Sequence, residues 1–307
     1  MLIKRLKTLA ASLIPLLVVL PGAAYPDSQT SLNVFACEPE WAALAKVLGE
    51  DKLTIYSATT AMQDPHHIQA RPSLIAKARR ADLLICSGAE LEVGWLPLLL
   101  RKASNQKIQP GQKGYFMAAD HVEKLDVPLT LDRSLGDVHA EGNPHIHTSP
   151  ENILRVAKVL SERLLDIDEK NADFYQNNYK LFEQRWRQSI IKWQQQAEVL
   201  KDINIITHHT YWSYLNHWAN MNVLATLESI AGVSPSSGHL AKVKKKMAKN
   251  QVKMIIHVAY VSERPSVWLS EQTGVPVIAL PASVDFQNGQ SLELWFDGII
   301  NQLVTMP

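Results

Sequence analysis

Short apolar runs alternate with amphipathic segments along most of the chain. Strand-like runs rich in Val, Ile and Leu stand at residues 33–36, 53–56, 83–86, 204–207, 222–226, 253–258 and 277–280. Apolar residues at three- and four-residue steps predict helices at about 39–48, 72–81, 90–100, 151–165, 241–250, 265–272 and 292–303. Strands that alternate with helices favour an α/β fold with mostly parallel sheets.

One segment in the middle of the chain has a different pattern. Residues 168–200 contain neither Gly nor Pro, and large apolar side chains such as Phe182, Trp186 and Trp193 recur there at helical steps. This pattern predicts a single amphipathic helix of about 28 to 32 residues, long for a globular protein. We therefore predict an N-terminal α/β lobe (25–165), a linking long helix (166–200) and a C-terminal α/β lobe (201–307).

The N-terminal segment does not belong to either lobe. Basic residues at Lys4, Arg5 and Lys7 precede an apolar run over residues 9–20, and small residues follow at 22–24. This order is typical of a cleaved signal peptide, which we place at residues 1–24. The apolar run is short for a membrane anchor, so we expect no stable membrane insertion. Because no Cys follows it, we expect a periplasmic protein that is not a lipoprotein.

Charge and cysteine content restrict the possible partners. The chain has 31 Lys and Arg against 30 Asp and Glu, so nothing favours nucleic acid or an anionic membrane as a partner. We expect a monomer.

The two cysteines, Cys37 and Cys86, lie near the ends of two strand-like runs. They could form a disulfide if those strands are parallel neighbours, or they could be two buried thiols.

Histidines are concentrated in three short clusters that are far apart in the sequence. Six of the 11 histidines stand in Asp64-Pro65-His66-His67, in Asn143-Pro144-His145-Ile146-His147 and in Thr207-His208-His209. Imidazole is a common ligand of zinc and neighbouring metals. Any one cluster alone could be an ordinary turn or a surface site. The three together favour a metal site if the fold brings them to one place.

The predicted topology supplies such a place. Open α/β sheets bind ligands in loops at the carboxyl ends of their strands. The first cluster follows a strand of the first lobe, and the third cluster and Asp285 follow strands of the second. A crevice between the lobes would then collect His66 or His67, His145, His208 or His209, and Asp285. Three imidazoles and one carboxylate suit tetrahedral Zn²⁺.

These motifs resemble those of the metal-binding solute receptors of ABC importers, the zinc and manganese receptors called ZnuA/TroA-like (cluster A-I). The matching segments are Asp64-Pro65-His66 with Pro72-Ser73, Ala81-Asp82-Leu83-Leu84-Ile85, Asn143-Pro144-His145 with Ser149-Pro150, His208 with Tyr211 and Tyr214, and Gly274-Val275-Pro276-Val277. The resemblance covers nearly the whole chain after the leader and keeps the order of the motifs.

The resemblance implies two Rossmann-like lobes joined by a rigid helix, with a metal site in the cleft between them. It also implies capture of a divalent metal and delivery to an ABC-importer membrane permease. Matched residue by residue, it gives His66, His145 and His208 as ligands. The fourth ligand of the family is variable, and Asp285 is our candidate for it.

The chain departs from the family pattern at several positions. Asn143 replaces the usual Asp, and His147 stands where many members have an aromatic residue. The His-rich loop of many zinc receptors is reduced to residues 136–142, where His139 is either a transient ligand or part of an ordinary solvated loop. His67, His147 and His209 could orient the ligand histidines without binding the metal themselves.

An imidazole-rich set favours Zn²⁺ as the cargo, with Mn²⁺ or another divalent metal as alternatives. A metallochaperone or a metal-dependent adhesin would use the same residues. A zinc hydrolase is a further alternative, but the chain has no His-Glu-x-x-His motif and no Gly-x-Ser-x-Gly elbow. We therefore expect a binding protein and not an enzyme.

Overall fold

The computed structural model describes residues 31–128, 136 and 139–306. The predicted signal peptide lies outside the described residues. Residues 31–307 form one compact unit, so the lobe boundaries expected near residues 165 and 200 stay predictions. In the described part of the chain, no helix combines the length and the hydrophobicity needed to cross a bilayer.

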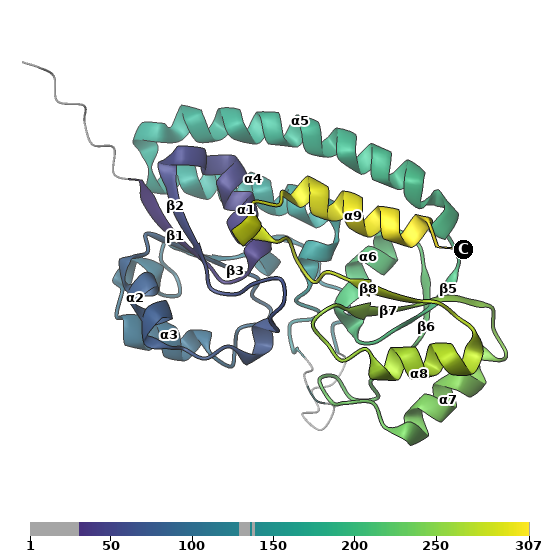
Figure 1. Ribbon diagram of the computed structural model, residues 1–307. Coiled ribbons are helices and arrows are strands. Elements are labelled where there is room, and N and C mark those ends of the chain that lie inside the picture. The colour runs from purple at the N-terminus through teal and green to yellow at the C-terminus, as the bar shows by residue number, and fades with distance from the viewer. Residues whose placement is uncertain (1–30, 129–135, 137–138, 307) are drawn as a thin grey trace, which may run out of the picture. The chain divides into compact units, whose positions relative to one another are not determined.

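The first half of the chain forms a parallel four-stranded sheet in the order β2-β1-β3-β4 (Figure 1). Its strands are β1 (Leu32–Ala36), β2 (Leu53–Ser57), β3 (Leu83–Cys86) and β4 (Tyr115–Met117). Its helices are α1 (Pro39–Gly49), α2 (Pro72–Arg80) and α3 (Leu96–Ala103). Central strand β3 is buried at every residue, which explains its uninterrupted apolar sequence.

The second half repeats this connectivity. Its parallel sheet has the order β6-β5-β7-β8, which is the same order as in the first sheet when the strands are counted from the start of each. The strands are β5 (Asn204–Thr207), β6 (Asn222–Thr226), β7 (Val252–Val258) and β8 (Val277–Leu280). The helices are α6 (Ser213–Trp218), α7 (Ser237–Met247), α8 (Arg264–Thr273) and α9 (Leu292–Val304). The predicted pair of Rossmann-like lobes is therefore confirmed.

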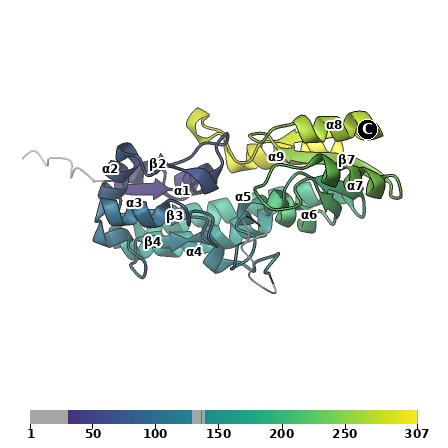
Figure 2. The same ribbon diagram turned by 90° about the horizontal axis from the view of Figure 1, so that it is seen from below.

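Two antiparallel helices, α4 (Pro150–Ile167) and α5 (Ala172–Ala197), connect the lobes. The side chain of Ser149 caps α4 by accepting a hydrogen bond from the backbone N–H of Asn152. Helix α5 has 26 residues and runs alongside both lobes, with short 3₁₀ turns at each end (Figures 1 and 2). The single long helix is confirmed, although it is slightly shorter than predicted.

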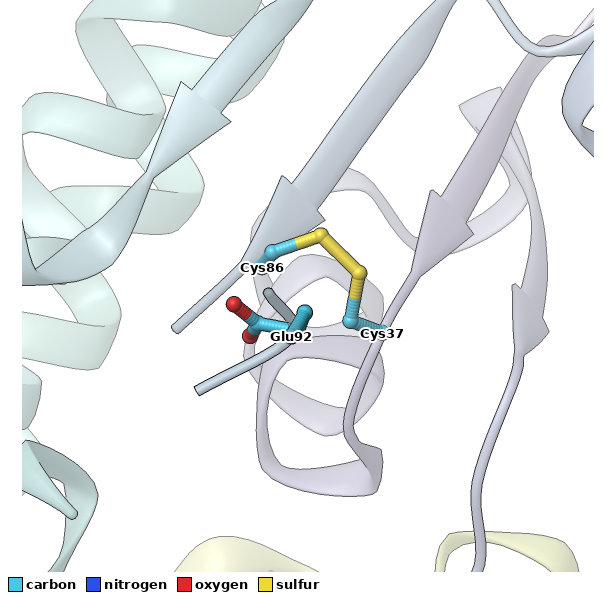
Figure 3. A group of neighbouring side chains, drawn as sticks. All are labelled: Cys37, Cys86 and Glu92. Carbon is cyan, nitrogen blue, oxygen red and sulfur yellow. A yellow bond between two sulfur atoms is a disulfide. The ribbon is translucent and has the colours of Figure 1, made fainter. Parts of the chain in front are cut away.

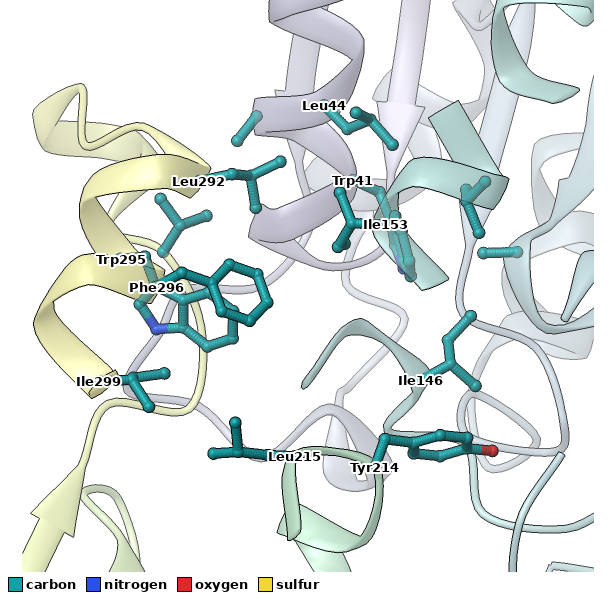
Figure 4. Packing of buried hydrophobic residues seen from close by; sticks show 14 of the residues in the cluster. Trp41, Leu44, Ile146, Ile153, Tyr214, Leu215, Leu292, Trp295, Phe296 and Ile299 are labelled. Atoms are coloured by element: carbon teal, nitrogen blue, oxygen red, sulfur yellow. The ribbon is translucent and has the colours of Figure 1, made fainter. Parts of the chain in front are cut away.

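The two lobes also touch each other directly through apolar side chains. Leu292, Trp295 and Phe296 of α9 belong to the same buried cluster as Trp41 and Leu44 of α1 (Figure 4). All five side chains are at most 1% exposed. The lobes are therefore joined by a continuous core as well as by α5, which opposes large hinge motions.

A few elements differ from the sequence-based expectation. Strand β4 and helix α6 were not predicted, because three and six residues are too few for a recognisable period. Helix α3 begins at Leu96 and not near residue 90. The reason is a left-handed turn at Gly88, Ala89 and Glu90, whose φ angles are 77°, 48° and 64°.

The cysteine alternatives are resolved by the position of the strands. Strands β1 and β3 are parallel neighbours, and Cys37 and Cys86 lie where these strands end. They form a disulfide with a Cα–Cα distance of 4.8 Å, and both residues are fully buried (Figure 3). The covalent bond ties together the two strands that carry the central part of the first sheet.

Removal of this disulfide should destabilise the protein without changing its fold. A Cys37→Ala/Cys86→Ala variant should lose about 2–4 kcal/mol of unfolding free energy, because the crosslink restricts the unfolded chain. Urea denaturation followed by circular dichroism measures the loss. Reduced wild-type protein is the matched control and should show a similar shift. An unchanged urea midpoint in both samples would contradict the prediction.

Candidate metal centre

The three histidine clusters meet at one place in the folded chain. His66 lies in a 3₁₀ turn (Pro65–His67) after β2, His145 precedes a 3₁₀ turn (Ile146–Thr148) before α4, and His209 follows β5. The rings of His66 and His145 are 5.6 Å apart, and those of His145 and His209 are 6.0 Å apart, between centroids. The crevice predicted from strand topology therefore collects one histidine from each cluster.

Asp64 fixes the orientation of the first histidine. Its Oδ1 accepts hydrogen bonds from the backbone N–H of His66, at 3.0 Å, and from the Nδ1 of the same residue, at 2.7 Å. Burial works to raise the pKa of Asp64, but the hydrogen bonds and charge of His66 outweigh it and lower that pKa. Because Nδ1 donates to the carboxylate, Nε2 presents its lone pair away from Asp64, as metal-bound histidines usually do.

His145 is the most deeply buried member of the group. It is 1% exposed, and neither ring nitrogen has a hydrogen-bond partner among the described residues. Its ring stacks on Tyr211 with 4.0 Å between centroids. Burial, followed by the proximity of His66 and His209, holds the pKa of His145 well below its usual value. The imidazole is therefore neutral, with a lone pair on one nitrogen that a metal could bind and a proton on the other.

The change from Asp to Asn before this histidine has a structural reason. Asn143 Oδ1 accepts a hydrogen bond from the backbone N–H of His145 at 2.9 Å, in the same way that Asp64 caps the first cluster. Its Nδ2 donates to the carbonyl of Thr210 at 2.7 Å and to Asp126 at 3.0 Å. A carboxylate could not donate to that carbonyl, so the amide here links the second cluster to the third.

Glu228, which the sequence analysis missed, holds the third cluster. Its Oε1 lies 3.3 Å from His208 Nε2, and its Oε2 lies 2.9 Å from His209 Nδ1. Burial works to raise the pKa of Glu228, but the hydrogen bonds from both histidines outweigh it and lower that pKa to about 2. Its position shortly after β6, at the same sheet edge as the histidines, was the available signal.

Of the four predicted ligands, the structure brings two together and places the other two elsewhere. His66 and His145 are brought together, and the ring beside His145 in the third cluster is that of His209. His208 is nearly buried, with Nε2 directed to Glu228 and Nδ1 without a hydrogen-bond partner in the described residues. Asp285 lies in an exposed turn after β8, where its carboxylate accepts hydrogen bonds from the backbone and side chain of Asn288. The structure thus does not bring Asp285 to the imidazoles.

The other histidines named from the sequence have distinct surroundings. His139 Nε2 lies 3.2 Å from His66 Nε2. Burial, and then the charges of His66 and His209, lower the pKa of His139 to about 4. His67 is exposed, with its ring 6.2 Å from that of His66. The four imidazoles therefore form a chain of neighbours: His139 lies beside His66, His66 beside His145, and His145 beside His209.

His147 is part of a buried polar network between the lobes. Its Nδ1 is 3.2 Å from Glu40 Oε1, at ion-pair distance but without hydrogen-bond geometry. Its Nε2 is 3.2 Å from both the Ala282 carbonyl and the Tyr211 hydroxyl. Glu40 in turn accepts a hydrogen bond from the Ser283 hydroxyl. His147 thus supports Tyr211, on which His145 stacks, and its own ring lies edge-on to that of His145 with 6.4 Å between centroids.

The spacing of the rings can be compared with that around a bound metal. Zinc–nitrogen bonds of 2.0–2.1 Å in a tetrahedron place ligand nitrogens about 3.3 Å apart and ring centroids about 5 Å apart. The observed 5.2 Å between His66 and His139 fits this spacing, whereas the 5.6 Å between His66 and His145 and the 6.0 Å between His145 and His209 are longer. In the described residues, the one group with all ligand atoms within 4.8 Å of each other is Cys37, Cys86 and Glu92, whose sulfurs are in the disulfide (Figure 3).

Two buried carboxyl groups, Glu38 and Glu92, lie beside Ser87 at the end of β3. Both accept hydrogen bonds from the backbone N–H of Ser87, and Glu92 also accepts from Gly88. Burial, and then the nearby Glu92, raise the pKa of Glu38 well above its usual value. Burial raises the pKa of Glu92 to about 7. The pair therefore retains a proton near neutral pH.

Two α/β lobes on one long helix, with imidazoles converging between them, are the architecture of a metal-binding solute receptor. Residues 34–305 match the family model described as the periplasmic component A of the zinc-uptake complex, ZnuA. The chain belongs to this family, the cluster A-I solute-binding proteins. It is thus a metal ABC transporter substrate-binding protein, with a divalent metal as cargo and a membrane permease as partner.

Curated relatives and solved structures agree with this assignment. The manganese ABC transporter substrate-binding lipoprotein PsaA of Streptococcus pneumoniae is 25% identical over 278 residues, which are 88% of this chain and 85% of the relative. The metal ABC transporter substrate-binding lipoprotein SloC of Streptococcus mutans is 22% identical over 281 residues, 90% and 89% of the two chains. A crystal structure of ZnuA superposes with a TM-score of 0.76 at 19% identity, over 90% of this chain and 99% of the other.

One prediction is contradicted by these relatives. From the absence of a cysteine after the N-terminal apolar run, we expected that the protein is not a lipoprotein. The curated relatives from streptococci are named lipoproteins. The expectation was wrong because it inferred the absence of an anchor from a leader segment alone.

The buried acid pair makes a prediction about stability and pH. The unfolded chain releases the corresponding protons near the ordinary glutamate pKa, whereas the folded chain retains one up to about pH 7. The folded state therefore binds more protons in this window, and stability should fall as pH rises from about 5 to 7, by at most about 1.4 kcal/mol per pH unit. Urea denaturation at several pH values measures this slope.

A Glu92→Gln variant should flatten that slope, because the amide does not ionise, while its oxygen can still accept the Ser87 and Gly88 N–H groups that now reach Glu92 Oε1. Glu123→Gln, at an exposed position, is the control and should keep the wild-type slope. Equal slopes in wild type and Glu92→Gln would show that the pair does not titrate in this range.

Proposed function

We propose that this protein is a receptor for Zn²⁺, which it delivers to its permease, and that it catalyses no reaction. The observation that carries the proposal is the environment of His145. A fully buried imidazole with two unpartnered nitrogens is costly unless a ligand satisfies it. A metal ion bound between the lobes would satisfy it.

The chemistry of the surrounding groups supports zinc over manganese. The side chains that the three clusters place beside one another are imidazoles, which suit zinc, copper and nickel, whereas manganese prefers oxygen ligands. The two nearby carboxylates, of Asp64 and Glu228, are each hydrogen-bonded to histidines and orient them. Among the metals that imidazole binds well, zinc fits a tetrahedral nitrogen site without redox chemistry.

We propose His66, His145 and His209 as ligands contributed by the three clusters. In two of them a carboxylate holds Nδ1, which leaves Nε2 for the metal: Asp64 acts on His66 and Glu228 on His209. The family motif instead points to His208. The proximity of the His209 ring to His145 favours His209 in the present geometry.

The same arrangement argues against hydrolysis. A catalytic zinc needs an open coordination position and a free base beside its water. Here, the neighbouring carboxylates are engaged by histidines, and His145 is almost inaccessible to solvent. A buried site of this kind suits the sequestration of a cargo ion.

Zinc titration against a competing chelator tests this proposal. The wild-type protein should bind one zinc per chain, and more tightly than manganese. His66→Ala, His145→Ala and His209→Ala should each lower zinc affinity by about 100-fold or more, because each removes a metal bond. His217→Ala changes an exposed histidine on α6 and should bind as the wild type does.

Two results would contradict the proposal. Tighter binding of manganese than of zinc would show that zinc is not the preferred cargo. Unchanged zinc affinity in His145→Ala would show that the metal binds elsewhere. A loss in His208→Ala with no loss in His209→Ala would reassign the ligand within the doublet.

Glu228 provides a second test, because it orients both histidines of the third cluster. Glu228→Ala should weaken zinc binding about 10- to 100-fold, the usual effect of removing a carboxylate behind a ligand histidine. Glu263→Ala, an exposed carboxylate, serves as the comparison. Zinc affinity within twofold of wild type in Glu228→Ala would exclude a role for this carboxylate in binding.

A further inference from the structure

We propose that His139 is a resident fourth ligand of the metal, and that Glu90 positions it. This inference rests on the proposed function and adds the residue that completes the site. It replaces Asp285, which lies in an exposed turn and is hydrogen-bonded to Asn288.

The first argument is the direction of two lone pairs. His66 donates its Nδ1 proton to Asp64, so in the neutral ring Nε2 carries a lone pair and no proton. This nitrogen lies 3.2 Å from His139 Nε2, close to the separation of about 3.3 Å between two nitrogen ligands of tetrahedral zinc. Without metal, His139 can donate a proton across this distance. When a metal is bound and His139 carries its proton on Nδ1, the Nε2 lone pairs of His66 and His139 can both bind the same cation.

The second argument is that the backbone beside His139 is anchored to the first lobe. The backbone N–H of Ala140 donates to Glu90 Oε2 at 2.6 Å. The carbonyl of His139 accepts a hydrogen bond from the Gly142 N–H at 3.1 Å, which closes a turn. The histidine is therefore held at the site by defined hydrogen bonds, unlike a transient ligand on a solvated loop.

The third argument concerns the unusual backbone that presents Glu90. Gly88, Ala89 and Glu90 have consecutive positive φ angles, and such angles are unfavourable for Ala and Glu. This turn interrupts the chain between β3 and α3 and directs Glu90 toward the residue 139–142 turn, while the next turn supplies Glu92 to the buried acid pair. Backbone strain of this kind tends to occur where a side chain must be held in a functional position.

A four-imidazole site would have a consequence for selectivity. Replacing an oxygen ligand with a fourth nitrogen disfavours manganese and favours zinc, copper or nickel. His139 is therefore expected to determine the ratio of zinc to manganese affinity as well as the zinc affinity itself.

The test compares His139→Ala, Glu90→Ala and Glu90→Gln with the wild type. His139→Ala should lower zinc affinity at least about tenfold, and manganese affinity should change much less. X-ray absorption of the zinc-loaded protein should report one imidazole fewer than in the wild type. Glu90→Ala should weaken zinc binding severalfold, and Glu90→Gln should restore it, because the amide oxygen can still accept the Ala140 N–H. Thermal unfolding of each variant checks that the fold is intact.

The outcomes separate this inference from the proposed function. Zinc affinity within twofold of wild type in His139→Ala, or an unchanged imidazole count, would overturn the role of His139. Equal weakening in Glu90→Ala and Glu90→Gln would overturn the role of the hydrogen bond to Ala140. Failure of the wild type to bind zinc, or full binding in His145→Ala, would instead reject the proposed function.

Discussion

The fixed placement of the two lobes is the constraint on which the candidate metal centre depends. Imidazoles from loops that are far apart in the sequence must lie about 5 Å from one another to share one ion. Helix α5 runs alongside both lobes, and α9 packs directly on α1 in one buried core. Because a close-packed core resists deformation, the loops at the strand ends are held at a nearly constant separation.

Within that frame, hydrogen bonds to carboxylates orient two of the imidazoles, and ring stacking orients a third. Asp64 and Asn143 each accept a hydrogen bond from the backbone N–H of the histidine two residues later. Asp64 and Glu228 also bind the Nδ1 atoms of their histidines. His145 has no such partner and is instead oriented by stacking on Tyr211, which the buried His147 supports. Because these carboxylates bind Nδ1, the Nε2 atoms of His66 and His209 point away from the carboxylates.

The parts of the fold that follow from periodicity could be predicted from the sequence. The α/β alternation, the long helix and the convergence of His66 with His145 all follow from apolar spacing and from the position of strand ends. Strand β4 was too short to show a pattern. Asp285 follows β8 as predicted, but the turn at Phe286–Asn288 directs its carboxylate to its own loop, which periodicity does not reveal. Glu228 follows β6 at the sheet edge that carries the histidines, but its hydrogen bond to His209 and that of Glu90 to Ala140 join separate segments and leave no pattern in the sequence.

The most direct test of the account is a crystal structure of the zinc-loaded protein with the ion located by its anomalous scattering. The account predicts one ion between the lobes, about 2.0–2.1 Å from a nitrogen of each of His66, His139, His145 and His209. An ion bound instead by Asp285, or located away from His145, would contradict it.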